Sequence, residues 1–394
     1  MENSFNELMK QAVIAHKDNR LEDAKKNYEE VIKIKPDYSI AYNNLGTILF
    51  ASGKLKEAES KYKKAIELNP DYLEAYNNLG NALYKLDNLD DAEIFYKKAL
   101  NLKSNFLPAL LSLGQISFVK NNFKDAHKYF DLCNTKDSRV RALISLYKLG
   151  RFDEIFESIK KFSQIDELNL GISAFSSFIE NITKKDTANN FCKNPLEFIY
   201  FSNISSHLKN PILFLEELTV ELKKQESIWE PFRKSTKKGY QSKYDLFINS
   251  NSITSNLKSI ILKEIDAYYS KYKNNSCSMI KKWPSKKNLE AWHVIYKKQG
   301  YQNPHNHITG WLSGVIYLKV VPTLENNEGS IEFSLNSTVY SDKSSPKFLH
   351  EPKVGDLILF PSSLYHRTIP FTTDDERIII SFNLMPEGFA PNYS

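Results

Sequence analysis

Residues 39–72 read SIAYNNLGTILFASGKLKEAESKYKKAIELNPDY, and residues 73–106 read LEAYNNLGNALYKLDNLDDAEIFYKKALNLKSNF. The two stretches share alanine, tyrosine, asparagine and leucine-glycine positions at a spacing of 34 residues. A fixed period of this length indicates a chain built from repeated structural units. The repeat therefore has to be followed along the chain before any other pattern is interpreted.

The same period extends to both sides of this stretch. A further copy precedes it. Another copy begins at Leu107 and contains the leucine-glycine pair again, as Leu113-Gly114. The shared columns are Ala24, Ala58, Ala92 and Ala126; Tyr28, Tyr62, Tyr96 and Phe130; Val31, Ala65 and Ala99; and Pro36 and Pro70. The repeat therefore occupies about residues 5–134.

Each copy is predicted to form two helices, for example over residues 40–52 and 55–68, because apolar residues recur there at helical spacing. Small residues such as Gly46 and Ala58 allow the paired helices to approach closely, and Tyr62 fills the space beside them. Pro70 follows the second helix, which it cannot continue. The copies are thus expected to stack as an all-α solenoid.

This pattern resembles a tetratricopeptide repeat array. A degenerate fifth unit is expected from the echo at residues 146–154, where a terminal copy would cap the stack. The resemblance implies a groove that binds a peptide or protein partner, lined by the amides of Asn43, Asn44, Asn77 and Asn78. Scaffolding or dimerisation remains an alternative role for the array, and ordinary solvated positions remain an alternative for the amides.

Length and composition limit the remaining possibilities. A chain of 394 residues predicts two or three domains, and no apolar run reaches the length of a membrane span. The N-terminus lacks a signal-peptide pattern, and three scattered cysteines are too few for a disulfide framework. The net charge of +6 is spread along a lysine-rich chain. We therefore expect a cytoplasmic protein with neither a membrane nor a nucleic-acid partner; the oligomeric state stays open.

The hydrophobic pattern changes along the second half of the chain. The helical pattern breaks at residues 186–190, which predicts a solenoid domain over residues 1–185 and a second domain over residues 190–394. Helices are expected at residues 212–225 and 252–271, with a polar loop at residues 237–242. Short β-rich runs follow at residues 291–297, 312–320, 330–334, 356–360 and 377–384. They predict an α+β domain with a jelly-roll core, also called a double-stranded β-helix.

Five of the eight histidines fall after residue 290. His305 and His307 have the i, i+2 spacing that places both side chains on one side of an extended segment. His366 follows about sixty residues later, and Arg377 lies eleven positions beyond it. The order and spacing of these residues indicate a metal site, whereas His293 and His350 are expected to be ordinary core or surface residues.

This order resembles the iron(II)/2-oxoglutarate-dependent oxygenases, and most closely a bacterial group of oxygenase-like proteins that are often joined to tetratricopeptide repeats. The resemblance is carried by residues 305–307, 313–318, 355–362, His366 and residues 377–383. It implies iron(II), 2-oxoglutarate and dioxygen as cofactor and co-substrates, with His305, His307 and His366 as metal ligands. No catalytic residue is expected beyond these ligands.

The resemblance also implies a pocket for the co-substrate. Arg377 would bind the distal carboxylate of 2-oxoglutarate, Tyr317 would donate its hydroxyl to the same group, and Tyr296 would line the pocket. Ser381 and Asn383 alternate with Arg377 along one strand, so they are expected to face the same side and to contact the co-substrate in this pocket. Trp292 and Trp311 are expected to be packing residues.

His307 departs from the family pattern, because a carboxylate is expected at this position. Either His307 binds the metal, or it points away and water takes its place, or the site has lost catalysis. Imidazole is a competent iron ligand and the spacing is kept, so ligation is favoured.

Three functions stay open at this point. The first is a dioxygenase that hydroxylates a substrate, preferably a peptide or protein, which the repeat array recruits. The second is a non-catalytic repeat adaptor whose jelly roll binds a metal or ligand. The third is a three-histidine metal oxygenase that does not use 2-oxoglutarate.

Overall fold

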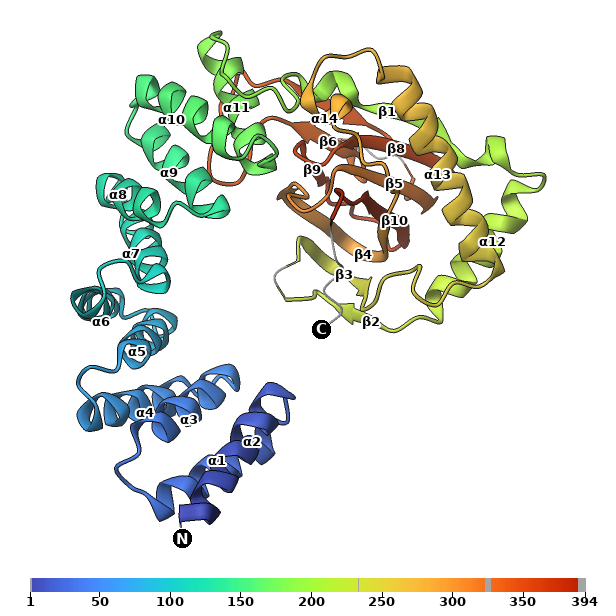
Figure 1. Cartoon of the computed structure of the whole chain (residues 1–394). Helices are drawn as coiled ribbons and strands as arrows, with labels where there is room; N and C mark the ends of the chain where they lie inside the picture. The colour runs from blue at the N-terminus through green and yellow to red at the C-terminus, as the bar shows by residue number, and fades with distance from the viewer. Residues whose placement is uncertain (1, 233, 323–326, 389–394) are drawn as a thin grey trace. The chain divides into compact units, whose positions relative to one another are not determined.

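A computed structural model describes residues 2–232, 234–322 and 327–388 of the chain, which divides into two compact units, residues 1–152 and 153–394 (Figure 1). The described part of the first unit is a series of helices joined by short turns. They are α1 (Glu2–Lys17), α2 (Leu21–Ile34), α3 (Ser39–Ala51), α4 (Leu55–Leu68), α5 (Leu73–Lys85), α6 (Leu89–Leu102), α7 (Leu107–Val119), α8 (Phe123–Cys133) and α9 (Lys136–Lys148).

The repeated small and aromatic residues pack against one another as the sequence predicts. Ala58 and Ala92 are fully buried, and Tyr62 and Tyr96 are almost fully buried. Each tyrosine ring lies against the glycine of its own copy, and a Cβ atom placed on Gly80 would lie 2.5 Å from the Tyr96 ring. The glycine column therefore exists because the aromatic ring occupies the space of a side chain.

We expect the substitution Gly80→Ala to lower the free energy of unfolding of the helical array by about 1–2 kcal/mol. Because the added Cβ atom would clash with a buried ring, the overpacking penalty should lie at about 2–3 kcal/mol, the upper part of its usual range, and so exceed the gain in helix propensity of about 1 kcal/mol. The helical circular-dichroism signal during denaturant unfolding of the full chain measures this change. In the double variant with Tyr96→Leu the clash disappears, so the two losses should not add; strict additivity would contradict the packing argument.

The expected degenerate unit corresponds to a turn and a further helix. Gly150 has a φ of +69°, close to the +76° of Gly53, which occupies the equivalent turn between α3 and α4. Glycine adopts this left-handed conformation without the strain that a Cβ atom would cause. Helix α10 (Phe152–Ile165) begins two residues later and is followed by α11 (Leu170–Thr183).

The described residues of the second unit contain an antiparallel sheet with flanking helices. Its helical elements after α11 are η1 (Pro195–Phe198), η2 (Ile204–His207), α12 (Pro211–Lys223), α13 (Ser252–Tyr272) and α14 (Ser278–Lys281). Its strands are β1 (Tyr200–Asn203), β2 (Ser227–Trp229), β3 (Thr236–Ser242), β4 (Leu289–His305), β5 (Leu312–Lys319), β6 (Ile331–Ser334), β7 (Lys347–His350), β8 (Asp356–Pro361), β9 (Tyr365–Thr368) and β10 (Arg377–Leu384).

The long strand β4 makes the sheet curl. The strand order is β1-β8-β5-β10-β4-β9-β6-β7, with β3 pairing both β4 and β2. The first half of β4 pairs with β10, whereas its last residues, Gln302 to His305, pair with β9 across a register shift. One strand thus joins two parts of the sheet, an arrangement compatible with the expected jelly roll.

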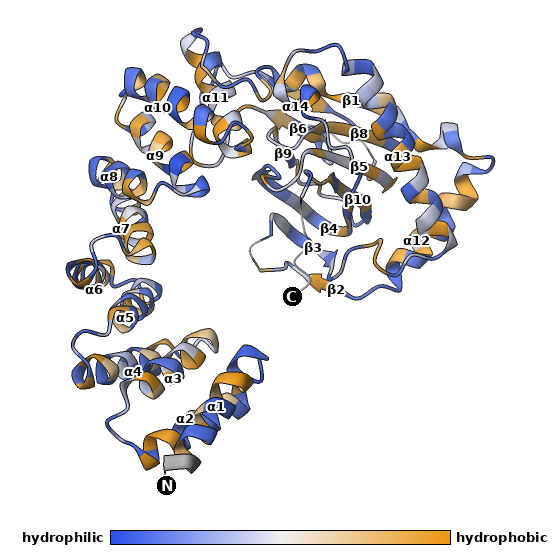
Figure 2. Ribbon diagram, viewed as in Figure 1, coloured by the Kyte–Doolittle hydropathy of each residue, from blue (hydrophilic) through white to orange (hydrophobic). Residues whose placement is uncertain are grey.

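The two faces of the sheet differ in chemistry. Ala291 and Ile295 of β4, together with Ile378, Ile380 and Phe382 of β10, belong to a hydrophobic core that also contains apolar residues of α12 and α13. Figure 2 shows hydrophobic and hydrophilic segments alternating along both helices. The alternate residues of the same strands face the opposite side, where the predicted site residues lie.

Some sequence-based predictions at this level were wrong. Residues 237–242 form most of strand β3 rather than a polar loop. The prediction failed because Lys237, Lys238 and Tyr240 are not buried whereas Gln241 and Ser242 are, so polar residues occupy both faces and hide the alternation.

Among the helices that the structure describes, none combines the length and apolarity needed to cross a bilayer.

Candidate functional site

Three histidines meet where the two parts of the curled sheet join. His305 is the last residue of β4 and lies directly opposite His366 of β9 in the antiparallel register, and His307 follows two residues later. The ring centroids are 4.3 Å apart for His305 and His366, 5.2 Å for His305 and His307, and 5.1 Å for His307 and His366. One nitrogen from each ring lies within 4.8 Å of the other two, which is suitable spacing for ligands of a single metal ion.

Hydrogen bonds determine which ring nitrogen of each histidine is protonated. The Nδ1 atom of His305 lies 2.8 Å from the carbonyl oxygen of Asn303, and that of His366 lies 3.3 Å from the carbonyl oxygen of Leu364. A carbonyl oxygen only accepts hydrogen bonds, so both Nδ1 atoms carry the proton. The Nε2 lone pairs of these two rings are therefore free to bind a metal.

The cluster is electrically neutral at pH 7. Burial lowers the pKa of His305 to about 3 and that of His307 to about 4, and it also lowers the pKa of His366 well below its ordinary value. The neighbouring histidines act in the same direction on His305 and His366. Neutral imidazole is the form that binds metals, so these rings need not lose a proton before they coordinate.

Arg377 lies at the start of β10 and is 1% exposed. None of its three guanidinium nitrogens has a hydrogen-bond acceptor among the residues that the structure describes. Its guanidinium carbon lies 5.1 Å from the ring centroid of Tyr317 and 5.7 Å from that of Tyr296. A buried cation without an anion is costly, so this environment fits an anionic ligand.

Two tyrosine hydroxyls accompany this unpaired cation. Tyr296 and Tyr317 are fully buried, and neither hydroxyl forms a hydrogen bond within the described ranges. Burial raises the pKa of Tyr317 to about 12 and raises that of Tyr296 as well, while the Arg377 charge opposes both shifts. Both hydroxyls are therefore protonated donors, and with the guanidinium fork they match what a carboxylate requires.

The two remaining predicted site residues, Ser381 and Asn383, lie in different surroundings. Asn383 lies beside the histidine cluster, with its Oδ1 atom 2.7 Å from Nδ1 of His307. Ser381 is buried on the same face of β10 between Arg377 and Asn383. The structure thus brings Asn383 to a histidine and leaves Ser381 on the strand between the arginine and the cluster.

A cavity of about 390 Å³ opens beside His305 and His307. Its wall includes Lys234, Glu290 and Trp292, and the Trp292 ring lies 5.5 Å from that of His307. A smaller cavity of about 180 Å³ has His366 in its wall. The histidine cluster is therefore reached by two cavities that could admit ligands.

The sequence analysis missed several residues of this site. Trp292 was expected to be a packing residue, but it lines the larger cavity; Trp311 does pack, against Phe191. Ser313 and Ser362 form hydrogen bonds around His307 and were not predicted. Only the pairing of β5 with β10 and β8 brings these serines to the cluster, and no sequence spacing reports that pairing.

Two other histidines lie outside the cluster, as the sequence analysis expected. His293 points to the apolar face of β4, is fully buried, and has no hydrogen-bond partner for either ring nitrogen in the described part of the chain. His350 lies 3.2 Å from the carboxylate of Asp356. That carboxylate also accepts hydrogen bonds from Asn203 and Lys353, so Asp356 stabilises a turn.

In the first unit, the asparagine amides mostly interact within the array. Asn78 donates to Asn43 at 3.0 Å, and Asn44 donates to the hydroxyl of Tyr28 at 3.2 Å. Asn77 is almost fully buried, and its Oδ1 atom has no hydrogen-bond partner among the described residues. These side chains are therefore mostly engaged in contacts within the array and are not solvated turn residues.

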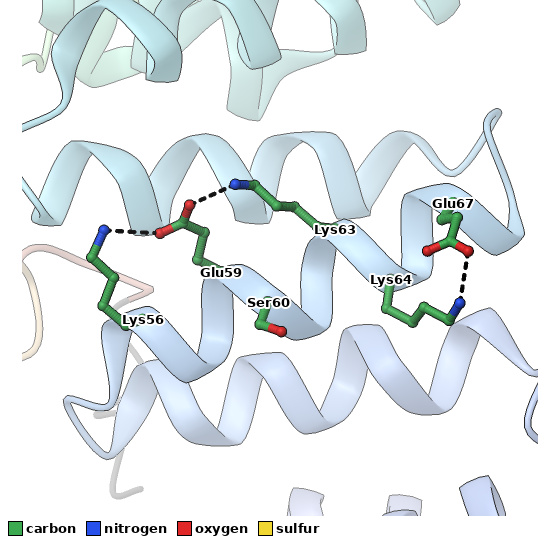
Figure 3. A pocket seen from close by; sticks show the side chains of 6 residues that line it. All are labelled: Lys56, Glu59, Ser60, Lys63, Lys64 and Glu67. Carbon is green, nitrogen blue, oxygen red and sulfur yellow. Dashed lines mark hydrogen bonds and ion pairs between the residues drawn. The ribbon is translucent and has the colours of Figure 1, made fainter.

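Figure 3 shows a shallow depression on α4, lined by Lys56, Glu59, Ser60, Lys63, Lys64 and Glu67. Glu59 pairs with Lys56 at 3.3 Å and with Lys63 at 2.8 Å, and Lys64 pairs with Glu67 at 2.7 Å. Each of these three lysines has a carboxylate partner on the same helix, so none of them is left unpaired for a charged ligand.

The fold and the site together define a repeat protein joined to a β domain with a candidate metal centre. Family models agree with this division: residues 290–383 match the family described as "Putative 2OG-Fe(II) oxygenase", and residues 8–38, 46–87 and 73–106 match tetratricopeptide repeat models. The chain thus combines tetratricopeptide repeats with an oxygenase-type domain, and the matched range includes every site residue predicted above. No curated protein matches the chain.

Among solved structures, the chain is similar to MamA, with 20% identity over 42% of this chain and 94% of that one and a TM-score of 0.39. It is also similar to the pilF protein of Pseudomonas aeruginosa, with 17% identity over 46% of this chain and 86% of that one and a TM-score of 0.41. A third is YrrB, described as a TPR protein with an unusual peptide-binding site, with 18% identity over 45% and 91% of the two chains and a TM-score of 0.37.

Proposed function

We propose that this chain is an iron(II)- and 2-oxoglutarate-dependent dioxygenase that hydroxylates a substrate, with a peptide or protein as the favoured class. The observation that supports it is the combination in one β domain of three neutral imidazoles and a buried, unpaired guanidinium. A metal ion requires the first group and a dicarboxylate co-substrate requires the second.

The donor set fits iron(II). His305, His307 and His366 would hold the ion, since imidazole is a good ligand for it, and three protein ligands leave other coordination positions open. When bound, iron(II) and 2-oxoglutarate supply the oxidation, in which dioxygen and 2-oxoglutarate are consumed, a substrate C–H bond becomes C–OH, and succinate and carbon dioxide are released.

The residues of the chain bind and orient the reactants. Arg377 would bind the distal carboxylate of 2-oxoglutarate through its planar fork, and Tyr317 would donate its hydroxyl to the same carboxylate. Tyr296 and Ser381 would line this pocket. The carbonyl groups of Asn303 and Leu364 accept from Nδ1 of two histidines, which would leave their Nε2 lone pairs available to hold the metal.

The repeat array would recruit the partner or substrate, because stacked helix pairs present an extended groove in which a peptide can lie. We further propose that the chain has a repeat domain over residues 1–185 and an oxygenase-like domain over residues 190–394. A cytoplasmic location completes the proposal.

A second candidate function is a three-histidine metal oxygenase that does not use 2-oxoglutarate. It is favoured by one observation: the cluster of ligand groups in the described residues contains no carboxylate. A non-catalytic adaptor differs from both, because it would bind a metal or ligand without turnover.

One experiment separates these functions. Metal-free protein is loaded anaerobically with iron(II), 2-oxoglutarate binding is measured by calorimetry, and succinate release is measured after oxygen is admitted. We expect metal-dependent 2-oxoglutarate binding and slow succinate release from the native chain, and loss of both from His366→Ala. The matched control, His350→Ala, removes an imidazole away from the cluster and should preserve both.

Each other result selects an alternative. Iron binding without 2-oxoglutarate binding would reject the proposal; consumption of dioxygen by the iron-loaded chain with a candidate substrate would then select the three-histidine oxygenase, and its absence would select the adaptor. Binding of both ligands without succinate release, repeated with candidate peptides, would favour the adaptor.

A further inference from the structure

His307 lies outside the strands that hold the other two histidines. Strand β4 ends at His305, and the backbone N–H of His307 donates to the carbonyl oxygen of Ser362 at 2.9 Å. A strand pairing fixes His305 opposite His366, but no strand pairing fixes the ring of His307. Its orientation therefore has to come from side-chain contacts.

Those contacts form a closed network around Nδ1 of His307. This atom lies 2.7 Å from Oδ1 of Asn383 and 3.1 Å from Oγ of Ser313. The Ser313 hydroxyl lies 2.8 Å from the same Asn383 oxygen and 2.8 Å from Oγ of Ser362. Asn383 is 3% exposed and the two serines are fully buried, so solvent does not compete for these bonds.

The donors and acceptors of the network can be assigned in one consistent direction. The Ser362 hydroxyl donates to Ser313, the Ser313 hydroxyl donates to the Asn383 amide oxygen, and that oxygen also accepts from Nδ1–H of His307. The proton of His307 is thus placed on Nδ1, and the lone pair is left on Nε2. The other two histidines have the same tautomer through backbone carbonyls.

The backbone of a nearby glycine closes the network. A Cβ atom on Gly310 would lie 2.8 Å from Oγ of Ser362 and 3.0 Å from Cγ of Asn383. The absence of a side chain at Gly310 therefore leaves the space that the Ser362 hydroxyl and the Asn383 amide occupy beside His307.

We propose that Asn383 is a positioning residue that orients His307 as the third metal ligand, rather than a residue that contacts the co-substrate. This inference rests on the proposed metal centre. His305 and His366 are each oriented by a backbone carbonyl oxygen. For His307 the amide oxygen of Asn383, on the adjacent strand, has the same role. Because the amide is neutral, it fixes the ring without adding charge to a centre built from neutral ligands.

The test uses cobalt(II) as the metal probe in the full-length chain. Calorimetry measures the affinity, and proton NMR of the paramagnetic complex detects the exchangeable Nδ1–H of each ligating histidine. We expect three such resonances in the native chain. In Asn383→Leu we expect two, with an affinity about 10–100-fold lower. Asn383→Asp keeps an acceptor and should keep three resonances with native or tighter binding.

Asn203→Leu is the matched control, because the Asn203 amide donates to Asp356 and Val354 instead of a histidine. It should change neither the affinity nor the number of resonances. Native affinity with three resonances in a folded Asn383→Leu variant, or only two resonances in the native chain, would overturn the inference and leave the metal centre standing. Failure of the native chain to bind cobalt(II) would overturn both, whereas cobalt binding without 2-oxoglutarate binding would overturn the proposed function alone.

Discussion

The substitution Arg377→Met is expected to weaken 2-oxoglutarate binding by a factor of about 100 or more and to stabilise the ligand-free protein. The guanidinium is fully buried between two tyrosine hydroxyls, and no acceptor among the described residues pairs with it. Removal of a charge-assisted, bidentate partner of a buried carboxylate costs about 3 kcal/mol or more in binding. Calorimetry with a redox-inert metal in place of iron(II) measures this loss.

The gain in stability follows from the same burial. In the ligand-free protein the buried Arg377 charge has two tyrosine rings beside it but no hydrogen-bond acceptor among the described residues, whereas methionine fills a similar volume without a charge. We expect the free energy of unfolding to rise by about 1–4 kcal/mol, the range found when buried ion pairs are replaced by apolar side chains. Added 2-oxoglutarate should then stabilise the native chain but not the variant.

Two further variants keep this prediction testable. Arg377→Lys retains the charge but loses the planar fork, so it should bind 2-oxoglutarate with intermediate affinity. Lys319→Met removes a cation from an exposed position next to Ile378 and should change neither property. Undiminished 2-oxoglutarate binding in Arg377→Met would show that the carboxylate lies elsewhere.

The helical unit was predictable from sequence because its information is local. Each helix pair repeats the same residues at the same spacing. The glycine and tyrosine at positions 46 and 62 recur at positions 80 and 96, and this recurrence indicates that the two residues of each copy are in contact. The β domain was predictable only in part. Strands with mostly apolar sequences that are buried on both faces, such as β5 and β10, were found, whereas the polar strand β3 was taken for a loop and the four-residue strand β9 was missed.

The residues of the candidate site were likewise predictable from the sequence only in part. His305, His307, His366 and Arg377 were selected because their order resembles a known family, and the structure does gather the three histidines. The position of Asn383 beside His307 depends on which strands pair, and that is decided by contacts between segments more than seventy residues apart. Sequence spacing describes neighbours along one strand and therefore could not separate Asn383 from Ser381.

Acidification is expected to destabilise the β domain through His293, a histidine that the proposed function does not use. Burial lowers the pKa of His293 to about 4 in the folded chain, compared with about 6.5 in an unfolded chain. Between these pH values the unfolded state binds a proton that the folded state does not. The free energy of unfolding should therefore fall as the pH falls from 6.5 to 4, by about 3 kcal/mol in total from this group.

The substitution His293→Leu should remove the His293 contribution to this dependence, while His305, His307 and His366 keep theirs, and it should also raise the free energy of unfolding at pH 7 by about 1–2 kcal/mol. The reason is that neither ring nitrogen has a hydrogen-bond partner in the described residues, so the imidazole is buried at a net cost.

His293→Gln separates the two effects. Glutamine cannot titrate, so this variant should abolish the His293 contribution to the acid slope. It keeps a buried polar group, so it should not gain stability at pH 7. Denaturant unfolding of the metal-free chain at several pH values measures both quantities. An acid slope that persists unchanged in both variants would mean that His293 is accessible to protons in the folded state, which contradicts its burial against the apolar face of the sheet.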